Sequence, residues 1–583
     1  MRALTCFFGV LALVLGWPAW AVSYPSVWAV STMEKVRPQT APGTRSSVQL
    51  FAARNEFVSF QVGLHGGDSG WSGVSASLPA LEGPARIEGA DIVLYREALL
   101  LVTVPSTQHS EAGWWPDGLV PDVDETLGEK RQAFPMDVPA RESRALWVDV
   151  HVPIDAPPGE YRGTVEVVGM GYRAQVDVSL TVVDWVMPST SSLRTNFLLW
   201  TPAVCKAFTG QRECSREDQL RLLSYFHKLG LEHRITLSSH FDTHEIPDWT
   251  TFETWWDPFL WGTAPLRLPG ARMTSVQFLG QPTPAQRADY LAQLGARGLL
   301  PLSFTVVGDE PPWHSSFEEV RARATLSRQL TPQLRTMLTI YSLEDLERWG
   351  LSDLIDIAVV MVDSIFSTRV LSERAGTPSP YEAFLRRPNR ELWLYQSCYN
   401  HGCGGSRPEN VPGQGWPSYM MDRPAAKARA LEWISFQMGA TGELYYQVAE
   451  MLSTAWTNQY TYGGNGDGTL FYPGTVPVIG GTVDVPLPSL RLKLIRQGLQ
   501  DYEWLKRVGE ADPAFAHEVA REVVPAPWRV PDDGELFERA RVRLIQRYLL
   551  MIGAEVPEAM DTYLSEHPGL PSRDVIEPVR LEQ

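Results

Sequence analysis

The chain has 583 residues, 44% of them hydrophobic and 20% charged, and its formal net charge is −17 at pH 7. A chain of this length exceeds what one hydrophobic core can hold, so we expect two or three domains. The negative charge and the lack of a basic run argue against nucleic acid or an anionic membrane surface as a partner, because both are bound through clustered Lys and Arg.

The N-terminus has the pattern of a secretory signal peptide. Arg2 precedes an apolar run at 7–16, and Ala19-Trp20-Ala21 is a small-x-small cleavage pattern. We therefore expect residues 1–21 to be removed and the mature protein to be secreted or periplasmic. No later run reaches the roughly 18 apolar residues that a membrane-spanning helix needs, so no membrane span is expected.

Four cysteines remain after this cleavage, namely Cys205, Cys214, Cys398 and Cys403. Because an oxidising compartment favours disulfides, closeness in sequence predicts the pairs Cys205–Cys214 and Cys398–Cys403. A zinc site made of Cys398, His401 and Cys403 would lack a fourth ligand and the usual spacing. We expect neither a metal nor another cofactor.

Residues 22–187 predict an antiparallel β-sandwich. Two short strands are expected within 47–64 and one at 145–150, and apolar residues alternate with polar ones over 161–167 and 176–182. Period-two alternation is typical of strands with one face buried and one face in water. Nothing in this domain suggests catalysis.

Residues 190–510 alternate strands with helices, which is the rhythm of a (β/α)8 TIM-type barrel. Seven strands are predicted and an eighth is poorly marked; the seven are 194–200, 235–237, the apolar run that ends before Asp309, 337–341, 357–362, 391–395 and 443–448. Long inserts at 241–280 and 449–488 are expected at the mouth of the barrel.

Polar residues predict where helices of this region begin. Such N-terminal signals are Ser215 with Asp218, Ser315 with Glu318, Asp422 before a helix to 437, and Ser489 before a helix to 506. Residues 511–583 are predicted to form a C-terminal helical segment and a tail. The acidic, proline-spaced stretch from about 555 has the composition of a disordered tail.

Two adjacent carboxylates, Asp309 and Glu310, end a short apolar run rich in β-branched residues. Because Glu310 precedes Pro311, we expect its backbone to be extended. In parallel α/β architectures the carboxyl ends of strands are where ligands meet catalytic groups. A solvated turn is the alternative interpretation, since acids are common in such loops.

Adjacent carboxylates suit one form of glycoside hydrolysis. Cleavage needs a proton donor for the leaving oxygen and stabilisation of the positive anomeric carbon. Two separated carboxylates can supply both. In the substrate-assisted route a 2-acetamido sugar attacks its own anomeric carbon, while one acid donates the proton and one carboxylate holds the acetamido N–H. Neighbouring residues suit this second route because both targets lie on one edge of the same sugar.

Several stretches, in this order and spacing, resemble glycoside hydrolase family 123 and the N-terminal β-sandwich module found with it. They are Arg54-Asn55-Glu56, Ala156-Pro157-Pro158-Gly159-Glu160-Tyr161, Gly308-Asp309-Glu310-Pro311, Leu392-Trp393-Leu394-Tyr395 leading into Cys398, 466–473, and 488–492 continuing through 496–503. The resemblance implies a retaining, substrate-assisted β-N-acetylhexosaminidase on a TIM barrel, acting on an N-acetylgalactosamine-like sugar of a glycan. It implies Glu310 as general acid/base and Asp309 as the residue that orients the acetamido group.

Other residues at the predicted strand ends are candidates for substrate binding. They are His240, Asp363, Trp393, Tyr395, Tyr445 and Asp467. Side chains alternate along a strand, so Trp393 and Tyr395 can both face inward, with core packing as the alternative. Asp467 lies in a glycine-rich turn, or in a loop that folds over the site and binds sugar hydroxyls.

Two other functions remain open from the sequence. One is a glycosidase for sugars without an acetamido group, in which Glu310 acts with a distant Asp363 or Asp467. The other is a non-catalytic carbohydrate-binding surface protein. The chain has no Gly-x-Ser-x-Gly elbow and no His-Glu-x-x-His motif, which removes two competing hydrolase classes.

Overall fold

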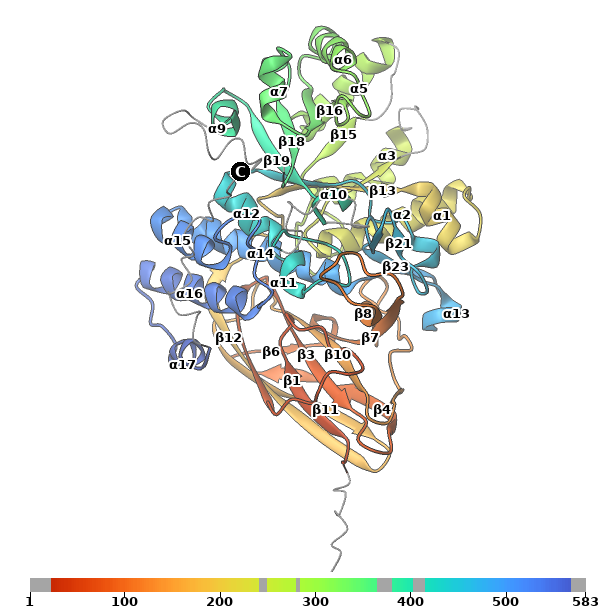
Figure 1. Cartoon of the computed structure of the whole chain (residues 1–583), viewed down its shortest axis with the longest axis vertical. Coiled ribbons are helices and arrows are strands. Elements are labelled where there is room, and N and C mark those ends of the chain that lie inside the picture. The colour runs from red at the N-terminus through yellow and green to blue at the C-terminus, as the bar shows by residue number, and fades with distance from the viewer. Residues whose placement is uncertain (1–22, 241–248, 279–283, 364–379, 402–414, 568–583) are drawn as a thin grey trace, which may run out of the picture.

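The computed structural model describes residues 23–240, 249–278, 284–363, 380–401 and 415–567. A lobe of strands occupies one end of the molecule and a barrel with its helices the other, and the C-terminal helices lie beside their junction (Figure 1). The predicted signal peptide and Cys403 lie outside the described residues. In the described part, no helix combines the length and apolarity needed to span a membrane.

The N-terminal lobe consists of two facing sheets. The first has the order β1 (Ser26–Val30), β3 (Phe57–His65), β10 (Ser143–His151), β7 (Ile92–Val102) and β8 (Gly113–Pro121). The second has the order β2 (Ser47–Arg54), β12 (Tyr172–Val186), β11 (Gly159–Gly169), β4 (Trp71–Ser77) and β9 (Met136–Val138); β5 (Ala80–Glu82) pairs with β11, and β6 (Arg86–Glu88) pairs with β5. The expectation of an antiparallel sandwich needs one correction, because β2 pairs with β12 in parallel.

Both faces of the first sheet are buried. Phe60 and Val62 of β3 and Leu146 of β10 belong to the core between the two sheets. Tyr95 and Trp147, which alternate with core positions, pack on the other face against the barrel domain. One buried face per strand was expected from the alternation, and the second arises because a neighbouring domain covers the sheet.

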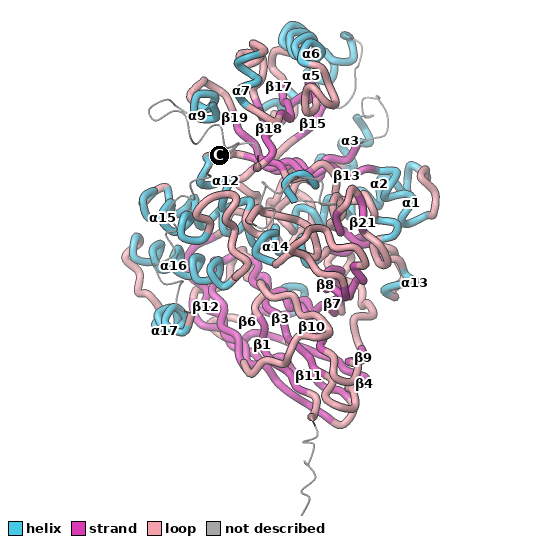
Figure 2. The backbone as a smooth tube through the Cα atoms, in the orientation of Figure 1, coloured by secondary structure: helices cyan, strands magenta, loops and turns pink. Residues whose placement is uncertain are grey.

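The second domain is a nearly closed barrel of eight parallel strands. Their order is β14 (Leu237–His240), β13 (Arg194–Trp200), β20 (Gly442–Tyr445), β19 (Glu391–Tyr395), β18 (Ile357–Met361), β17 (Arg335–Ile340), β16 (Ser303–Gly308) and β15 (Val276–Phe278). Strands of this barrel, among them β13, β15, β17, β18 and β19, are magenta in Figure 2. Among the described residues β14 and β15, at the two ends of this order, do not pair. The poorly marked strand is therefore β15, whose three residues lie in what was expected to be an insert.

Helices follow the strands on the outside of the barrel. They include α2 (Arg216–Glu232), α5 (Pro284–Ala296), α6 (Phe317–Leu330), α7 (Leu343–Arg348), α9 (Pro380–Leu385), α11 (Ala425–Ala428) and α12 (Leu431–Met438). Ser215 caps α2 as predicted, by accepting from the backbone of Asp218. The cap of α6 is shifted by one residue to Ser316, which forms a capping box with Glu319.

Two predictions about this region are wrong. Asp422 caps no helix; its carboxylate accepts hydrogen bonds from the backbone and hydroxyl of Ser106, at 2.7 and 2.6 Å, and the segment to 437 is split between α11 and α12. The stretch from 555 begins with an ordered helix, α17 (Glu558–Glu566), which packs on α16 (Glu535–Met551) through Met560. The nine residues of α17 are too few to show a clear helical period, and the acidic, proline-spaced composition of the stretch predicted a tail instead.

The junction of the two domains is built on α14 (Leu490–Gly509), which Ser489 caps as predicted. Arg491 forms a bidentate ion pair with Asp117 of β8, at 2.7 Å for both nitrogens. Lys493 and Arg496 both reach Asp149 of β10, at 2.7 and 2.8 Å. These charges are buried, so removing one partner would leave an unpaired charge in the junction, which typically costs about 3–5 kcal/mol.

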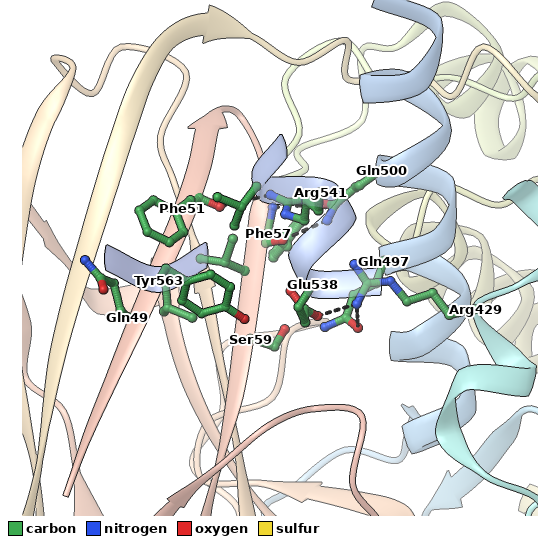
Figure 3. Close-up of a pocket in the computed structure, with 13 residues that line it drawn as sticks. Gln49, Phe51, Phe57, Ser59, Arg429, Gln497, Gln500, Glu538, Arg541 and Tyr563 are labelled. Atoms are coloured by element: carbon green, nitrogen blue, oxygen red, sulfur yellow. Dashed lines mark hydrogen bonds and ion pairs between the residues drawn. The ribbon is translucent and has the colours of Figure 1, made fainter. Parts of the chain in front are cut away.

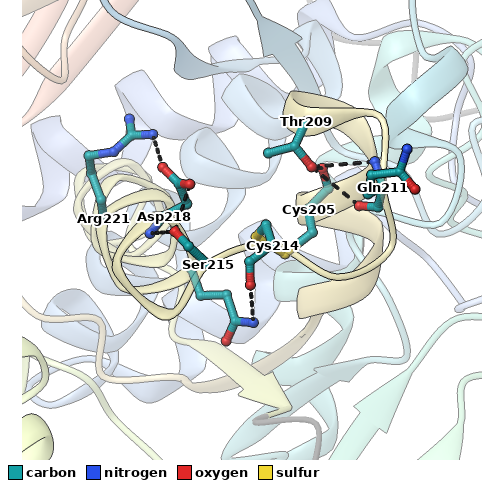
Figure 4. Close-up of a disulfide and its surroundings, with 8 residues drawn as sticks. Cys205, Thr209, Gln211, Cys214, Ser215, Asp218 and Arg221 are labelled. Atoms are coloured by element: carbon teal, nitrogen blue, oxygen red, sulfur yellow. Dashed lines mark hydrogen bonds and ion pairs between the residues drawn. A yellow bond between two sulfur atoms is a disulfide. The ribbon is translucent and has the colours of Figure 1, made fainter.

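A disulfide joins Cys205 and Cys214, as predicted. Cys205 lies in α1 (Thr201–Thr209), and Cys214 immediately precedes the N-cap of α2 (Figure 4). The bond therefore ties the first two helices after β13 to each other at the edge of the barrel.

Candidate active site

Asp309 and Glu310 follow β16 directly, at the carboxyl end of the parallel barrel. Their side chains are held differently, since that of Asp309 is 60% exposed and that of Glu310 is 15% exposed. The apolar strand before them explains this position. Phe304 and Val307 of β16 are buried, and the chain leaves the sheet at Gly308.

The backbone at Glu310 differs from the extended conformation predicted for a residue before proline. Its φ is 38°, in the left-handed region, which costs a non-glycine residue about 1–3 kcal/mol. The neighbouring strand β17 holds this conformation, because the Glu310 N–H donates to the carbonyl of Thr339 at 3.0 Å and lies 3.2 Å from its hydroxyl. Such strain is characteristic of functional positions.

Two tyrosine hydroxyls donate hydrogen bonds to the Glu310 carboxylate. Tyr341, just after β17, donates to Oε2 at 3.1 Å, and Tyr395, the last residue of β19, donates to Oε1. Strands β16 and β19 are separated in the sheet by β17 and β18, so the Tyr395 contact crosses the barrel interior. Burial, together with the Glu310 charge, raises the pKa of Tyr395, which keeps this hydroxyl protonated as a donor. Glu310 therefore points into the mouth of the barrel.

Asp309 has its own supports. The hydroxyl of Thr339 donates to Oδ1 at 2.5 Å, and the Asp309 N–H donates to the Ser315 hydroxyl at 3.1 Å. His314 lies beside both acids, with Nδ1 3.5 Å from Asp309 Oδ2 and 3.4 Å from Glu310 Oε2. Because the Asp309 side chain is 60% exposed, its carboxylate remains accessible to a ligand.

The inner face of β16 is open to solvent at this level. Phe304 is buried in the barrel interior, whereas Val306, two residues on and on the same face, is 37% exposed. Solvent therefore reaches the inside of the barrel above the layer that contains Phe304, and a ligand can approach the two acids from there.

Trp393 and Tyr395 both face inward, as their spacing predicted, but at different depths. Both belong to the buried cluster of the barrel interior, with Met337 and Met361. The Trp393 ring is fully buried and donates to Glu391 Oε2 at 2.9 Å, toward the opposite end of the strand. These contacts fit the core-packing alternative for Trp393, whereas Tyr395 reaches Glu310.

Tyr445 and Asp467 contact one another. The Tyr445 hydroxyl donates to Asp467 Oδ1 at 3.2 Å and accepts from the Gly468 N–H at 2.8 Å. Gly466, with φ 88°, presents its carbonyl to Arg491 at 2.7 Å, and a Cβ at this glycine would lie 2.6 Å from that guanidinium. Asp467 is only 1% exposed, so the glycine-rich loop folds its carboxylate inward.

The pH dependence of stability should reveal this buried carboxyl. Burial raises the pKa of Asp467 from 3.8 to about 6, so the folded protein retains a proton there that the unfolded chain has lost. This contribution to stability is full below about pH 4 and is lost as the pH rises through 6. Relative to wild type, Asp467→Asn should gain on the order of 2–3 kcal/mol of unfolding free energy between pH 4 and pH 7. Denaturant unfolding at both pH values measures this; a difference that does not change with pH would contradict it, and Asp155→Asn, at an exposed site, is the control.

The remaining candidates lie at strand ends. His240 ends β14, and its side chain is outside the described part. Asp363 follows β18 by two residues and is 8% exposed. The pair Cys398–Cys403 stays a prediction, because Cys403 is not described. Within the described ranges, no three His, Cys, Asp or Glu side chains are grouped as metal ligands would be.

Sequence reasoning missed three residues of this site, namely His314, Thr339 and Tyr341. For two of them a signal was present. Met337, Thr339 and Tyr341 alternate along one predicted strand, so an inward Met337 places the other two on the inner face. His314 has no such signal, because its position depends on the turn after Pro312.

Comparison with known proteins places this geometry in context. Residues 32–169 match the family model of the glycoside hydrolase 123 N-terminal domain. A comparison with curated proteins found no match to the sequence. Among solved structures, the chain is similar to a family 123 glycoside hydrolase from Clostridium perfringens, studied for glycolipid glycan hydrolysis, with a TM-score of 0.64, 12% identity and coverage of 93% of this chain and 100% of that one.

Two weaker similarities are to a β-glucuronidase from Parabacteroides merdae and a putative β-galactosidase from Bacteroides fragilis. The first has a TM-score of 0.24, 9% identity and coverage of 77% of this chain and 50% of that one. The second has a TM-score of 0.24, 11% identity and coverage of 75% and 58%. At these TM-scores neither similarity supports a conclusion about the fold or the function. Residues 32–169 thus match the glycoside hydrolase 123 N-terminal domain, and the chain as a whole has the fold of the family 123 enzyme, which confirms the resemblance found in the sequence.

Proposed function

We propose that the protein is an exported, retaining glycoside hydrolase that removes terminal β-linked N-acetylhexosamine with the help of the substrate's own acetamido group. The observation that carries this proposal is the pair of adjacent carboxylates at the end of β16. Glu310 is partly shielded and held by two tyrosines, while Asp309 is exposed beside it. Two acids in different environments, side by side, suit two different tasks on one sugar.

In the first step the carbonyl oxygen of the 2-acetamido group attacks the anomeric carbon. The bond to the leaving oxygen breaks as Glu310 delivers a proton to that oxygen. The Asp309 carboxylate accepts a hydrogen bond from the acetamido N–H and stabilises the positive charge of the cyclic oxazolinium-like intermediate. In the second step Glu310 takes a proton from water as the water oxygen bonds to the anomeric carbon. The bond from that carbon to the acetamido oxygen breaks, which opens the oxazolinium ring and restores the acetamido group. Two displacements at the same carbon retain its configuration.

The burial of the other acids supports this route over one with two separated carboxylates. Asp467 is 1% exposed and receives the Tyr445 hydroxyl, and Asp363 is 8% exposed. A nucleophile or base must reach the sugar or a water beside it. Asp309 is more exposed than either Asp363 or Asp467.

Substrate preference tests the proposal. We expect turnover of aryl N-acetyl-β-galactosaminide, measured beside the matching glucosaminide, and a much smaller kcat/KM for the aryl β-galactoside, which differs only in having a hydroxyl at carbon 2. Equal rates on the galactosaminide and the galactoside would favour a second carboxylate as nucleophile. Binding to glycans without release of product would favour a carbohydrate-binding protein.

Tyr395→Phe tests the support of the catalytic acid. The variant removes one hydroxyl and leaves the ring that packs inside the barrel, so we expect an unchanged fold and a loss of about 10–100-fold in kcat/KM, the range for a misplaced catalytic group. Tyr290→Phe, which removes a hydroxyl from the buried α5 position, is the matched control. Equal kinetics for Tyr395→Phe and wild type would show that this hydrogen bond does not position Glu310.

Export follows from the N-terminal pattern and is part of the proposal. Expression of the full chain with its own leader in a bacterial host should give a mature protein beginning at Val22, outside the cytoplasm. N-terminal sequencing of the purified protein checks this, and a start at Met1 would contradict it.

A further inference from the structure

The N-terminal domain contains a cavity that the proposed hydrolase reaction does not use. It has a volume of about 520 Å³, within the range of about 300–1,000 Å³ that is common for small-molecule sites. Its lining comes from β7 to β10 and the segments beside them, and includes Arg96, Glu97, Trp114, Asp137, Glu142 and Arg144. The strands of both sheets thus meet around it.

Arg96 is the unusual member of this lining. It lies opposite Leu146 in the β7–β10 ladder, and Leu146 belongs to the core between the two sheets. The Arg96 side chain therefore lies on the face of the first sheet that is turned toward the second sheet. Among the described residues, no side chain or carbonyl hydrogen-bonds to its guanidinium, and no carboxylate pairs with it. Burial lowers the pKa of Arg96 without an opposing charge to offset it. A guanidinium with no protein partner keeps its donors available for a ligand.

The other charged residues of the lining do not form ion pairs with Arg96. Arg144 lies two residues before Leu146 on β10, hence on the same face, and pairs with Glu142 at 2.7 Å. Asp137 accepts the Gly73 N–H at 2.9 Å. Burial raises the pKa of Glu97 to about 8, so this carboxyl is mostly neutral at pH 7. Arg96 is therefore the cation of this lining that has no carboxylate partner among the described residues.

Two other cavities in the described part of the chain do not share this feature. In the small cavity of about 40 Å³ at the domain junction, Arg429 and Glu538 pair with each other, and Arg541 donates to the carbonyl of Phe51 (Figure 3). In a larger cavity of about 850 Å³, Arg267 is bound by Glu125 and Glu232. In these two cavities the arginines are satisfied from within the chain.

Trp114 supplies an apolar surface in the same cavity. Its side chain is 44% exposed although it is among the largest apolar groups, and the flat face of an indole suits the C–H face of a pyranose ring. A guanidinium fork matches a carboxylate by two parallel hydrogen bonds. We propose that this cavity binds a carboxylate-bearing sugar, a uronic or sialic acid residue, with its carboxylate on Arg96 and its ring against Trp114.

This site is an anchoring site for an acidic residue of a glycan and is separate from Asp309 and Glu310. The proposal does not depend on the hydrolase reaction, because it concerns equilibrium binding by the sandwich. Its failure would leave the proposed catalysis untouched, and loss of catalysis in a Glu310 variant would leave this binding intact.

The test is titration of the full wild-type chain with methyl β-D-glucuronide and with methyl N-acetyl-α-neuraminide, followed by calorimetry or ligand-observed NMR. At least one of the two acids should bind, and which one binds identifies the sugar class. Its methyl ester, which keeps the ring and removes the charge, should bind at least about tenfold more weakly, the range for a charge-assisted hydrogen bond.

Variants locate the binding. Arg96→Gln should weaken binding of the acid about tenfold or more and leave the weak binding of the ester unchanged, whereas Trp114→Ala should weaken both. Arg173→Gln removes an exposed arginine from the same domain and should have no effect. Three results would each overturn the proposal: equal affinity for acid and ester, an Arg96→Gln variant that binds the acid as tightly as wild type, or no binding of either acid. The comparison of acid with ester uses the wild-type chain, so it decides the matter even where a variant fails to fold.

Discussion

Replacing Glu310 with glutamine is expected to lower kcat/KM for an alkyl N-acetyl-β-hexosaminide by about 10³-fold, within the range for a lost general acid. Glutamine keeps the shape of the side chain and can still contact Tyr341 and Tyr395, so the loss should come from the missing proton rather than from the fold. An alkoxide leaves poorly without protonation. The loss should therefore shrink strongly for a dinitrophenyl glycoside, whose phenolate leaves without a proton.

The dependence on leaving group separates this role from a structural one. A variant that had merely disturbed the site would slow both substrates by the same factor, and that result would contradict the assignment of Glu310 as the acid. Glu318→Gln is the matched control, because Glu318 is an exposed acid in the first turn of α6, close in sequence to the site. It should keep wild-type rates with both leaving groups.

Replacing Asp309 with asparagine is expected to lower kcat by about 10²–10³-fold for acetamido substrates, the range for a lost charge-stabilising group. Asparagine can still accept the Thr339 hydroxyl, but it carries no negative charge to stabilise the oxazolinium-like intermediate. That charge develops in the transition state, so KM should change far less than kcat.

The substrate's own nucleophile offers an independent readout. Fluorine atoms on the acetyl group withdraw electrons from its carbonyl oxygen, so wild-type kcat should fall progressively from acetyl to trifluoroacetyl substrates. Rates that do not respond to fluorination would show that the acetamido group is not the nucleophile. Asp155→Asn, at an exposed position of the sandwich, should match wild type throughout.

The sequence was informative about the fold where patterns were long. Seven of the eight barrel strands were predicted from the alternation of strand and helix patterns along residues 190–510. The eighth, β15, has three residues and no periodicity to detect. The helix α17 was missed for a related reason, since nine residues in an acidic stretch resemble a tail until Met560 is seen packed on α16.

The site was predicted less completely than the fold. Asp309 and Glu310 could be placed at the end of a strand from composition alone. The φ of 38° at Glu310 could not, because it depends on the hydrogen bonds that the Glu310 N–H donates to Thr339 on the neighbouring strand, and it opposes the local preference of a residue before proline. Likewise, nothing local separates Trp393, deep in the barrel, from Tyr395 at its mouth. Depth depends on how the eight strands stagger around the barrel.

The most direct test of the central claim is inhibition by an N-acetylgalactosamine-derived thiazoline, a stable mimic of the cyclised acetamido intermediate. If Asp309 and Glu310 act on a sugar that uses its own amide, the thiazoline should bind wild type at least about 100-fold more tightly than N-acetylgalactosamine, as expected for an analogue of an intermediate. Asp309→Asn should lose most of that advantage. Equal affinities for the thiazoline and the parent sugar, or an Asp309→Asn variant that binds the thiazoline as wild type does, would contradict the account.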